Sequence, residues 1–234
     1  GYYRYDAGYS PDFPGRDRFS GPVVHPQHWP EGLDVAGKEV VVIGSGATAV
    51  TLVPALANQG AHVTMVQRTP TYVAALPSRD RVADALRRRL PEDRAYAAIR
   101  RKNITTSALN YQLSRKAPKV MKALLRYGAR KALPADFDVD THFAPPYNPW
   151  DQRLCLAPDG DLFATITAGR AEVVTDRIAT FTEVGVQLAS GRQVPADVIV
   201  TATGLNLLVL GGLRITVDDV AVQAADTVGY KGAM

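Results

Sequence analysis

Cysteine is nearly absent from this sequence: among 234 residues only Cys155 is a cysteine. A lone cysteine cannot form an internal disulfide, and it excludes, within these residues, the cysteine pair on which disulfide oxidoreductases depend. Because Cys155 stands between Leu154 and Leu156 in an apolar stretch, we predict a buried thiol with no reactive role. C-x-x-C and H-E-x-x-H patterns are also missing, so no metal site is expected.

Long hydrophobic runs are missing as well. No stretch approaches the roughly 20 apolar residues that a membrane-spanning helix needs, and no charged-then-apolar leader opens the sequence. With 46% hydrophobic residues the chain can still form a buried core, so we expect a globular cytoplasmic protein of one or two domains. The chain starts at Gly1 rather than methionine and stops at Met234 after a turn-like Lys231-Gly232. We therefore expect it to be part of a longer protein.

Acidic residues are scarce in one block, residues 79–132. The block holds 16 of the 27 Lys and Arg but 4 of the 23 Asp and Glu, a net charge of +12 against −8 for the rest. It reads as helices interrupted at Pro91 and Pro118, and residues 119–131 alternate apolar and basic positions at helical spacing. We expect this basic helical insertion to cover a core and turn its charge to water. The alternative is peripheral association with an anionic membrane surface.

The stretch KEVVVIGSGATA, residues 38–49, organises the chain. Val40 to Ile43 are β-branched without polar alternation, which predicts a strand buried on both faces. The next six residues fit G-x-G-x-x-A, in which the glycines allow a tight turn and close approach of a pyrophosphate. Helix 47–59 and strand 62–67 then complete a βαβ unit. The sequence therefore predicts a dinucleotide-binding site at Gly44, Ser45, Gly46, Ala47, Thr48 and Ala49.

Arg68 follows the second strand, 24 positions beyond Gly44. An NAD-binding unit usually has Asp or Glu here to bind the ribose 2′-hydroxyl, whereas a guanidinium suits the 2′-phosphate of NADP. We predict NADPH as the nucleotide. A solvated arginine at the end of a strand remains the alternative.

Residues 1–37 are rich in proline, which blocks long helices and inner strands. They contain the pattern F-x-G-x-x-x-H-x-x-x-W-P, made of Phe19, Gly21, His25, Trp29 and Pro30. On chemistry alone, His25 is best interpreted as bonding a backbone group in a packed linker.

The second half of the chain gives weaker signals. Residues 133–158 read as a loop that leads to Arg153. Asp161 is a plausible N-cap for a helix to about Ala168. Strands are expected near 171–175, 180–189 and 194–201, the last running into Ala202-Thr203-Gly204.

The proline-rich pattern followed closely by G-x-G-x-x-A resembles the fingerprint and second dinucleotide motif of the Baeyer–Villiger monooxygenases, which are class B flavoprotein monooxygenases. Residues 67–72, 148–153 and 202–204 also match that family's motifs. The resemblance implies an α/β fold, a Rossmann-like NAD(P)-binding domain of the two-dinucleotide-binding-domain flavoproteins, with a helical insertion. It implies a connector at 1–37 bordering the FAD domain, an NADP-binding domain at 38–196, and a truncated return segment to the FAD domain at 197–234.

The same resemblance implies the activity. NADPH and FAD would serve as cofactors, and one oxygen atom from O₂ would enter a ketone, giving an ester or lactone, or would oxygenate a sulfide or thioamide. Arg153 would be the catalytic residue and Thr203 and Gly204 part of the cofactor site. No nucleic-acid partner is expected. On the residues alone, an arginine that merely pairs with Asp151 or a neighbouring carboxylate is the competing interpretation.

No second G-x-G-x-x-G is present, so the motif that would bind the ADP half of FAD is not among these residues. Two alternatives stay open. A nitrogen- or sulfur-oxidising flavin-containing monooxygenase of the other subclass shares both glycine motifs, but its fingerprint typically lacks the Trp-Pro ending. The chain could also be a non-catalytic NADP-binding fragment.

Overall fold

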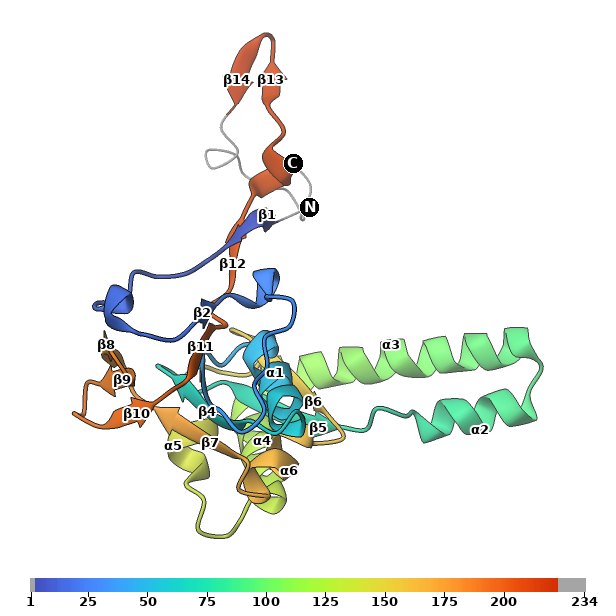
Figure 1. The fold of residues 1–234 in the computed structure, drawn as a ribbon. Coiled ribbons are helices and arrows are strands. Elements are labelled where there is room, and N and C mark those ends of the chain that lie inside the picture. The colour runs from blue at the N-terminus through green and yellow to red at the C-terminus, as the bar shows by residue number, and fades with distance from the viewer. Residues whose placement is uncertain (1–2, 223–234) are drawn as a thin grey trace.

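A five-stranded parallel sheet forms the centre of the computed structural model, which describes residues 3–222 (Figure 1). Its strand order is β2-β11-β3-β4-β7. The strands are β2 (Val23–Val24), β11 (Val198–Thr201), β3 (Glu39–Ile43), β4 (His62–Gln67) and β7 (Ala171–Thr175). The predicted βαβ unit is confirmed, with α1 (Ala47–Asn58) between β3 and β4. Residues 223–234, the end of the expected return segment, lie outside the described residues.

Side chains of β3 alternate between two hydrophobic cores. Val40 and Val42 join the core under α1, whereas Val41 and Ile43 face the core on the opposite side of the sheet. That side is covered by a three-stranded antiparallel sheet of β8 (Ile178–Thr182), β9 (Gly185–Leu188) and β10 (Gln193–Pro195). Burial on both faces is therefore confirmed for residues 40–43, and it explains why these four positions are all apolar.

Two of the predicted strands are wrong in extent. The stretch 180–189 is not one strand but the hairpin of β8 and β9, which turns at residues 183–184. The stretch 194–201 is divided between β10 and β11, which belong to different sheets. The chain changes sheet at Asp197. Pairing with β9 stops at Pro195, and the Asp197 backbone N–H donates to the Glu39 carbonyl of the parallel sheet.

The segment predicted as a loop, 133–158, is also partly regular. It contains α5 (Val139–Phe143) and β6 (Leu154–Pro158), and β6 pairs in parallel with β5 (Tyr72–Leu76). The sequence did not indicate these two strands because β5 and β6, which pair with each other, are far apart in the chain. Cys155 lies in β6 and is buried as predicted, and burial raises the pKa of its thiol.

Helix α6 (Asp161–Thr167) is present where a helix was expected, but its cap is not Asp161. Gly160 is the N-cap, in the left-handed conformation at φ 72°. Asp161 is the first helical residue, and its carboxylate accepts a hydrogen bond from Leu162 N. The glycine provides the backbone turn that an aspartate cap adopts less readily.

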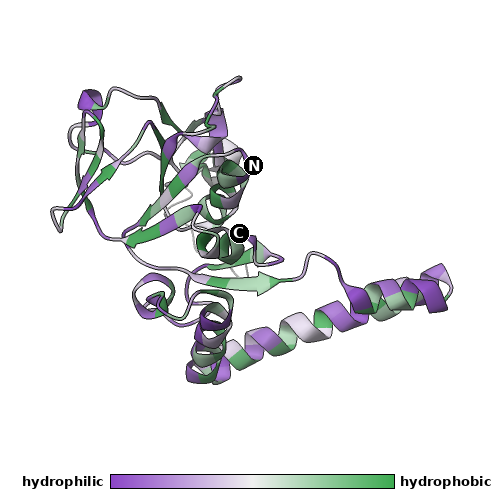
Figure 2. Ribbon diagram, turned by 60° about the horizontal axis from the view of Figure 1, so that its bottom comes forward, coloured by the Kyte–Doolittle hydropathy of each residue, from purple (hydrophilic) through white to green (hydrophobic). Residues whose placement is uncertain are grey.

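The basic insertion is helical and breaks at both predicted prolines. It consists of α2 (Arg81–Arg89), α3 (Glu92–Lys116) and α4 (Pro118–Ala132). Helices α2 and α3 form a hairpin that extends away from the sheet (Figure 1). Hydrophobic and hydrophilic residues are interspersed along both helices (Figure 2).

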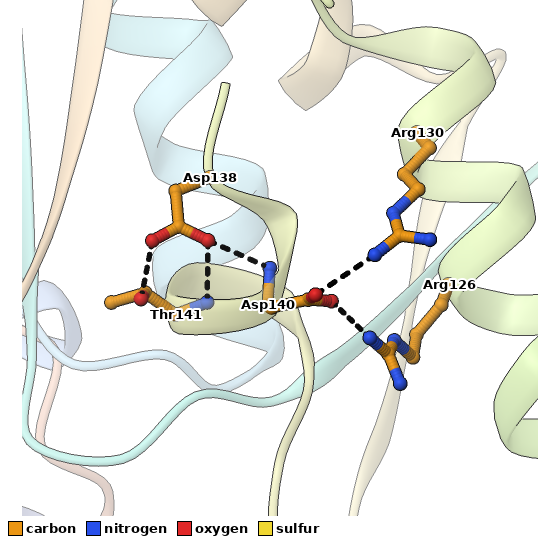
Figure 3. Close-up of polar contacts among 5 residues, drawn as sticks. All are labelled: Arg126, Arg130, Asp138, Asp140 and Thr141. Atoms are coloured by element: carbon orange, nitrogen blue, oxygen red, sulfur yellow. Dashed lines mark hydrogen bonds and ion pairs between the residues drawn. The ribbon is translucent and has the colours of Figure 1, made fainter. Parts of the chain in front are cut away.

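Polar contacts fasten α4 to α5 (Figure 3). Arg126 and Arg130 of α4 both donate to the carboxylate of Asp140. Asp138 caps α5 by accepting from the backbone N–H groups of Asp140 and Thr141. The bond from the Thr141 hydroxyl, followed by these backbone bonds, lowers the pKa of Asp138. These ion pairs lie at the surface, since the side chains of Arg126 and Arg130 are 40% and 56% exposed, which agrees with the expectation that the basic face turns to water.

The apolar face of α4 differs from expectation. Val120, Leu124 and Tyr127 are 52%, 53% and 66% exposed, and Ala129 is the buried residue of this helix. The helix is amphipathic as predicted, but within residues 3–222 most of its apolar face covers no core.

The first described strand, β1 (Tyr3–Gly8), pairs antiparallel with β12 (Leu205–Leu207), which follows the parallel sheet in sequence. Strands β13 (Ile215–Val217) and β14 (Val220–Val222) form a further hairpin. Short 3-10 helices complete the described residues: η1 (Arg16–Arg18), η2 (Pro26–His28) and η3 (Val209–Gly212).

Candidate dinucleotide-binding site

A pocket of about 910 Å³ opens at the carboxyl ends of β3, β4, β7 and β11. This is the edge at which open α/β sheets bind ligands. Nine of the ten predicted catalytic and cofactor-binding residues line it, namely Gly44, Ser45, Gly46, Ala47, Thr48, Arg68, Arg153, Thr203 and Gly204. The tenth, Ala49, is fully buried beneath the turn.

The two glycines of the turn have different structural roles. Gly44 has φ +134°, and a Cβ there would lie 2.4 Å from the Ala202 carbonyl oxygen, so the fold itself requires glycine. Gly46 has an ordinary φ of −79°, and a Cβ there would meet nothing within 4 Å. Glycine at 46 therefore leaves open space against the backbone rather than relieving a clash, as the approach of a ligand phosphate requires.

Helix α1 begins at this pocket without a side-chain cap. Gly46 is its N-cap, no side chain accepts from its first N–H groups, and its first turn has no acidic residue. The free N–H groups and the positive end of the helix dipole favour an anion here. Ala47 and Thr48 bring this first turn to the pocket wall.

Arg153 reaches the glycine turn through two hydroxyl groups. Its Nε donates to Thr71 Oγ1 at 3.1 Å, and its Nη2 donates to Ser45 Oγ at 3.2 Å. The hydroxyls lie 2.9 Å apart, and Ser45 also donates to the Thr69 carbonyl. With Thr71 donating to Ser45 and Ser45 donating to the Thr69 carbonyl, both hydroxyl protons have an acceptor. The guanidinium is therefore held on the pocket wall with its charge uncompensated by these neutral partners.

The competing interpretation of Arg153, an ion pair with Asp151, is wrong. The Asp151 carboxylate accepts from Arg115 and from Asn148, and these bonds lower its pKa. The backbone carbonyl of Arg153 accepts instead from the Tyr147 hydroxyl at 3.0 Å. Tyr147 is held in turn by Tyr72, whose hydroxyl donates to its carbonyl at 2.8 Å. Burial raises the pKa of Tyr72, so this hydroxyl remains a donor.

The fingerprint residues lie beside the pocket and hold two linkers in place, residues 1–37 before β3 and the segment that follows β11. His25 Nδ1 accepts from the Gln27 backbone N–H, so Nε2 carries the proton and donates to the Gly204 carbonyl at 3.0 Å. The interpretation of His25 as a linker histidine bonding a backbone group agrees with this contact. Gly8 of β1 is packed so closely on the ring that a Cβ would lie 1.9 Å from it.

The other fingerprint residues are structural in their contacts. Phe19 is buried, and a Cβ on Gly21 would lie 2.3 Å from the Asp197 carbonyl oxygen. Trp29 packs on the main core, whereas Pro30 is exposed. Together they fix the path of the linker next to β11.

Thr203 and Gly204 join the second linker to the first. The Thr203 hydroxyl donates to the Tyr9 carbonyl at 2.6 Å, and Tyr9 N donates back to the Gly204 carbonyl. Gly204 has φ +110°, a conformation that favours glycine. These two residues thus form the pocket wall where both linkers meet.

Sequence reasoning missed two residues that line the pocket, Asp176 and Arg177, and one buried residue behind its wall, Thr71. Thr71, 1% exposed, binds Arg153 from just before β5, a strand that was not predicted. Asp176 and Arg177 follow β7. The predicted end of that strand at 175 was the available signal, but its position beside β4 could not be read from the sequence.

Metal and membrane features are absent from the part of the chain that the structure describes. Within residues 3–222 no group of three or more His, Cys, Asp or Glu side chains could hold a metal ion. None of the described helices is both long and apolar enough to cross a bilayer.

Comparisons with known proteins agree with this site. A family model for NAD(P)-binding proteins matches residues 32–132. The chain is 57% identical over 235 residues to the FAD-containing monooxygenase EthA of Mycolicibacterium smegmatis and 55% identical to EthA of Mycobacterium tuberculosis. Each match covers 100% of this chain and 48% of the relative, so the chain spans about half the length of these curated relatives.

Solved structures share the fold. A steroid monooxygenase bound to NADP matches with a TM-score of 0.64 and 24% identity, over 86% of this chain and 45% of that chain. An open cyclohexanone monooxygenase matches with a TM-score of 0.61 and 22% identity, over 86% and 46%. At these identities the likeness concerns the fold alone. Over its whole length the chain is therefore similar to about half of the FAD-containing monooxygenase EthA, and it shares the fold of these solved monooxygenases.

Proposed function

We propose that the protein is an FAD- and NADPH-dependent monooxygenase, and that the pocket at the end of the sheet is its NADPH site. The observation that carries the proposal is the convergence of the glycine turn, Arg68 and Arg153 on one pocket. The match of the whole chain to 48% of the length of FAD-containing monooxygenases supports the same activity.

The described residues fit NADPH. The pyrophosphate would lie against Gly46 and the uncapped start of α1, where the missing Cβ leaves room and the N–H groups are free. Arg68 would bind the 2′-phosphate, since it lines the pocket one residue beyond β4. Thr203 and Gly204 would form the opposite wall. The hydride and the activation of O₂ are chemistry that NADPH and FAD supply when bound.

Arg153 would stabilise negative charge at the reacting centre. Oxygen insertion into a ketone develops an oxyanion, and a fixed guanidinium stabilises it without losing a proton. The partners of Arg153 in the pocket are hydroxyls rather than carboxylates, so its positive charge remains available. A small ketone, or a sulfide or thioamide, is the substrate class that this chemistry accepts.

The domain assignment remains a proposal as well. Residues 38–196 would form the NADP-binding domain, and residues 1–37 and 197–234 would connect it to an FAD domain. The pairing of β1 with β12 supports this, because both connections leave the sheet at one place. The glycine motif for the ADP half of FAD is not in these residues, so a polypeptide limited to them should purify colourless.

Oxygen uptake and product analysis would test the activity. With NADPH, FAD and a ketone or sulfide such as cyclohexanone or thioanisole, the full-length protein should consume O₂ and release ester or sulfoxide. Arg153→Ala should bind NADPH normally but lose roughly a hundredfold or more in product formation. NADPH binding without any oxygen consumption would support a non-catalytic NADP-binding role, and sulfoxide without ester would favour the other flavin-containing subclass.

A second proposal concerns location. The exposed apolar side chains of α4 lie among basic ones, which fits peripheral binding to an anionic membrane surface. Vesicles with anionic lipid should retain the protein at low salt and release it as salt rises, whereas neutral vesicles should retain little. Equal retention by both kinds, or by neither, would remove the membrane role and leave a helix exposed for another reason.

A further inference from the structure

A second arginine lies beside Arg68 at the pocket edge. In the parallel sheet Gln67 of β4 is the register partner of Thr175 of β7, and Asp176 N donates to the Gln67 carbonyl at 2.9 Å. Arg68 therefore follows β4 by one residue, and Arg177 follows the neighbouring strand by two. Both line the pocket. Two cations from adjacent strand ends thus face the same ligand space.

The backbone of Arg177 is fixed on both sides. The Asp176 carboxylate accepts from Arg177 N at 2.6 Å and from Ser190 N at 3.1 Å. The Arg177 carbonyl accepts from Ala189 N at 2.8 Å. These bonds tie the turn after β7 to the turn after β9, so the root of the Arg177 side chain is held relative to the sheet.

The nearby carboxylates form no ion pair with these arginines, although Asp176 stays charged because hydrogen bonds from Ser190 and from the Arg177 backbone N–H lower its pKa. Both oxygens of Asp176 are bonded to backbone N–H groups, and Asp12, the other acidic residue on the pocket lining, is exposed on the linker. Among residues 3–222, neither Arg68 nor Arg177 makes a side-chain hydrogen bond or ion pair. By contrast, Arg192 pairs with Glu172 at 2.7 Å on the adjoining surface.

We propose that Arg177 is a second ligand of the NADPH 2′-phosphate, and that it shares with Arg68 the discrimination of NADPH from NADH. The inference rests on the proposed NADPH site. A phosphate near charge −2 has three acceptor oxygens, and two guanidinium groups from different strands can bind it from two directions. Arg68 alone would leave part of that charge without a protein partner.

Equilibrium titration of the purified protein with NADP⁺ and with NAD⁺ would test this assignment. Arg177→Ala should weaken NADP⁺ binding by about tenfold. This effect is at the low end of that expected for a hydrogen bond to a charged group, because the Arg177 side chain is exposed and water screens its charge. NAD⁺ binding should not change. Arg68→Ala should have a similar effect, and the double variant should bind the two nucleotides alike. Arg89→Ala, which removes an exposed arginine from α2 outside the pocket, is the matched control.

The outcomes separate the two proposals. If the parent protein binds neither nucleotide, the NADPH site itself fails. If the parent prefers NADP⁺ and Arg68→Ala loses the preference while Arg177→Ala matches Arg89→Ala, only the role of Arg177 is overturned. Arg177→Lys keeps a charge but not the planar fork, so it should retain part of the preference. Adenosine 2′,5′-bisphosphate should compete with NADP⁺ in the parent and less well in Arg177→Ala.

Discussion

Thr71 offers the sharpest test of how Arg153 is positioned. Its hydroxyl accepts from Arg153 Nε at 3.1 Å and lies 2.9 Å from Ser45 Oγ, and its side chain is fully buried. Thr71→Val keeps the shape but removes both contacts. Hydrogen bonds to charged groups contribute about 1.5–3 kcal/mol. Since Arg153 is exposed, water can replace part of that, and we expect a loss of about 1–2 kcal/mol in unfolding free energy.

The functional loss should exceed the stability loss. Without Thr71 the guanidinium keeps its bond to Ser45 at 3.2 Å but is free to rotate about it. We expect roughly a tenfold drop in product formation, with NADP⁺ affinity nearly unchanged, because the 2′-phosphate is assigned to other residues. Combining Thr71→Val with Arg153→Ala should cost little more than Arg153→Ala alone, which a double-mutant cycle measures.

Thr165→Val is the matched control. Thr165 is also buried, and its hydroxyl donates to the Asp161 carbonyl at 2.8 Å within α6, outside the pocket. Denaturant unfolding should give a similar stability loss for both variants, whereas product formation should fall only for Thr71→Val. Equal product formation in both variants would refute the positioning of Arg153 by Thr71.

Three further expectations concern the glycine turn, the half-buried His142 and the buried Cys155. Gly44→Ala should destabilise the fold by at least about 2 kcal/mol, because of backbone strain and the clash with Ala202. Gly46→Ala should melt at the same temperature as the parent protein but bind NADP⁺ more weakly. The reverse pattern in thermal melting and NADP⁺ titration would contradict the roles assigned to the two glycines. Burial lowers the pKa of His142 from its usual 6.5, so the unfolded chain binds the proton more readily than the folded protein. The free energy of unfolding should therefore fall as pH drops below about 6.5. His142→Gln should flatten this pH dependence, and an unchanged slope would show that other groups cause it. Cys155 should react with a thiol reagent only slowly until the protein is unfolded, since burial raises its pKa; rapid labelling of the native protein would show otherwise.

The parts of the fold that were predictable depend on local sequence. The valine run, the glycine turn and the helix after it lie within 20 residues, and each residue type favours the conformation it adopts. Pro91 and Pro118 likewise ended helices where expected, because proline cannot continue the backbone hydrogen bonding of the preceding turn.

The rest depends on contacts between distant segments. Thr71 meets Arg153 only because β5 pairs with β6, and about 80 residues of insertion and loop separate those strands. Arg177 lies beside Arg68 because β7 is the neighbour of β4 across a longer crossover. Apolar residues at helical spacing in α4 predict an amphipathic helix, but this spacing does not show whether other segments cover the apolar face.

A crystal structure of the protein with NADP⁺ would test the central claim most directly. We expect the pyrophosphate against Gly46 and the first turn of α1, the 2′-phosphate between Arg68 and Arg177, and the nicotinamide on the side of Arg153. NADP⁺ bound away from the glycine turn, or with its 2′-phosphate directed into solvent and no arginine contact, would contradict it.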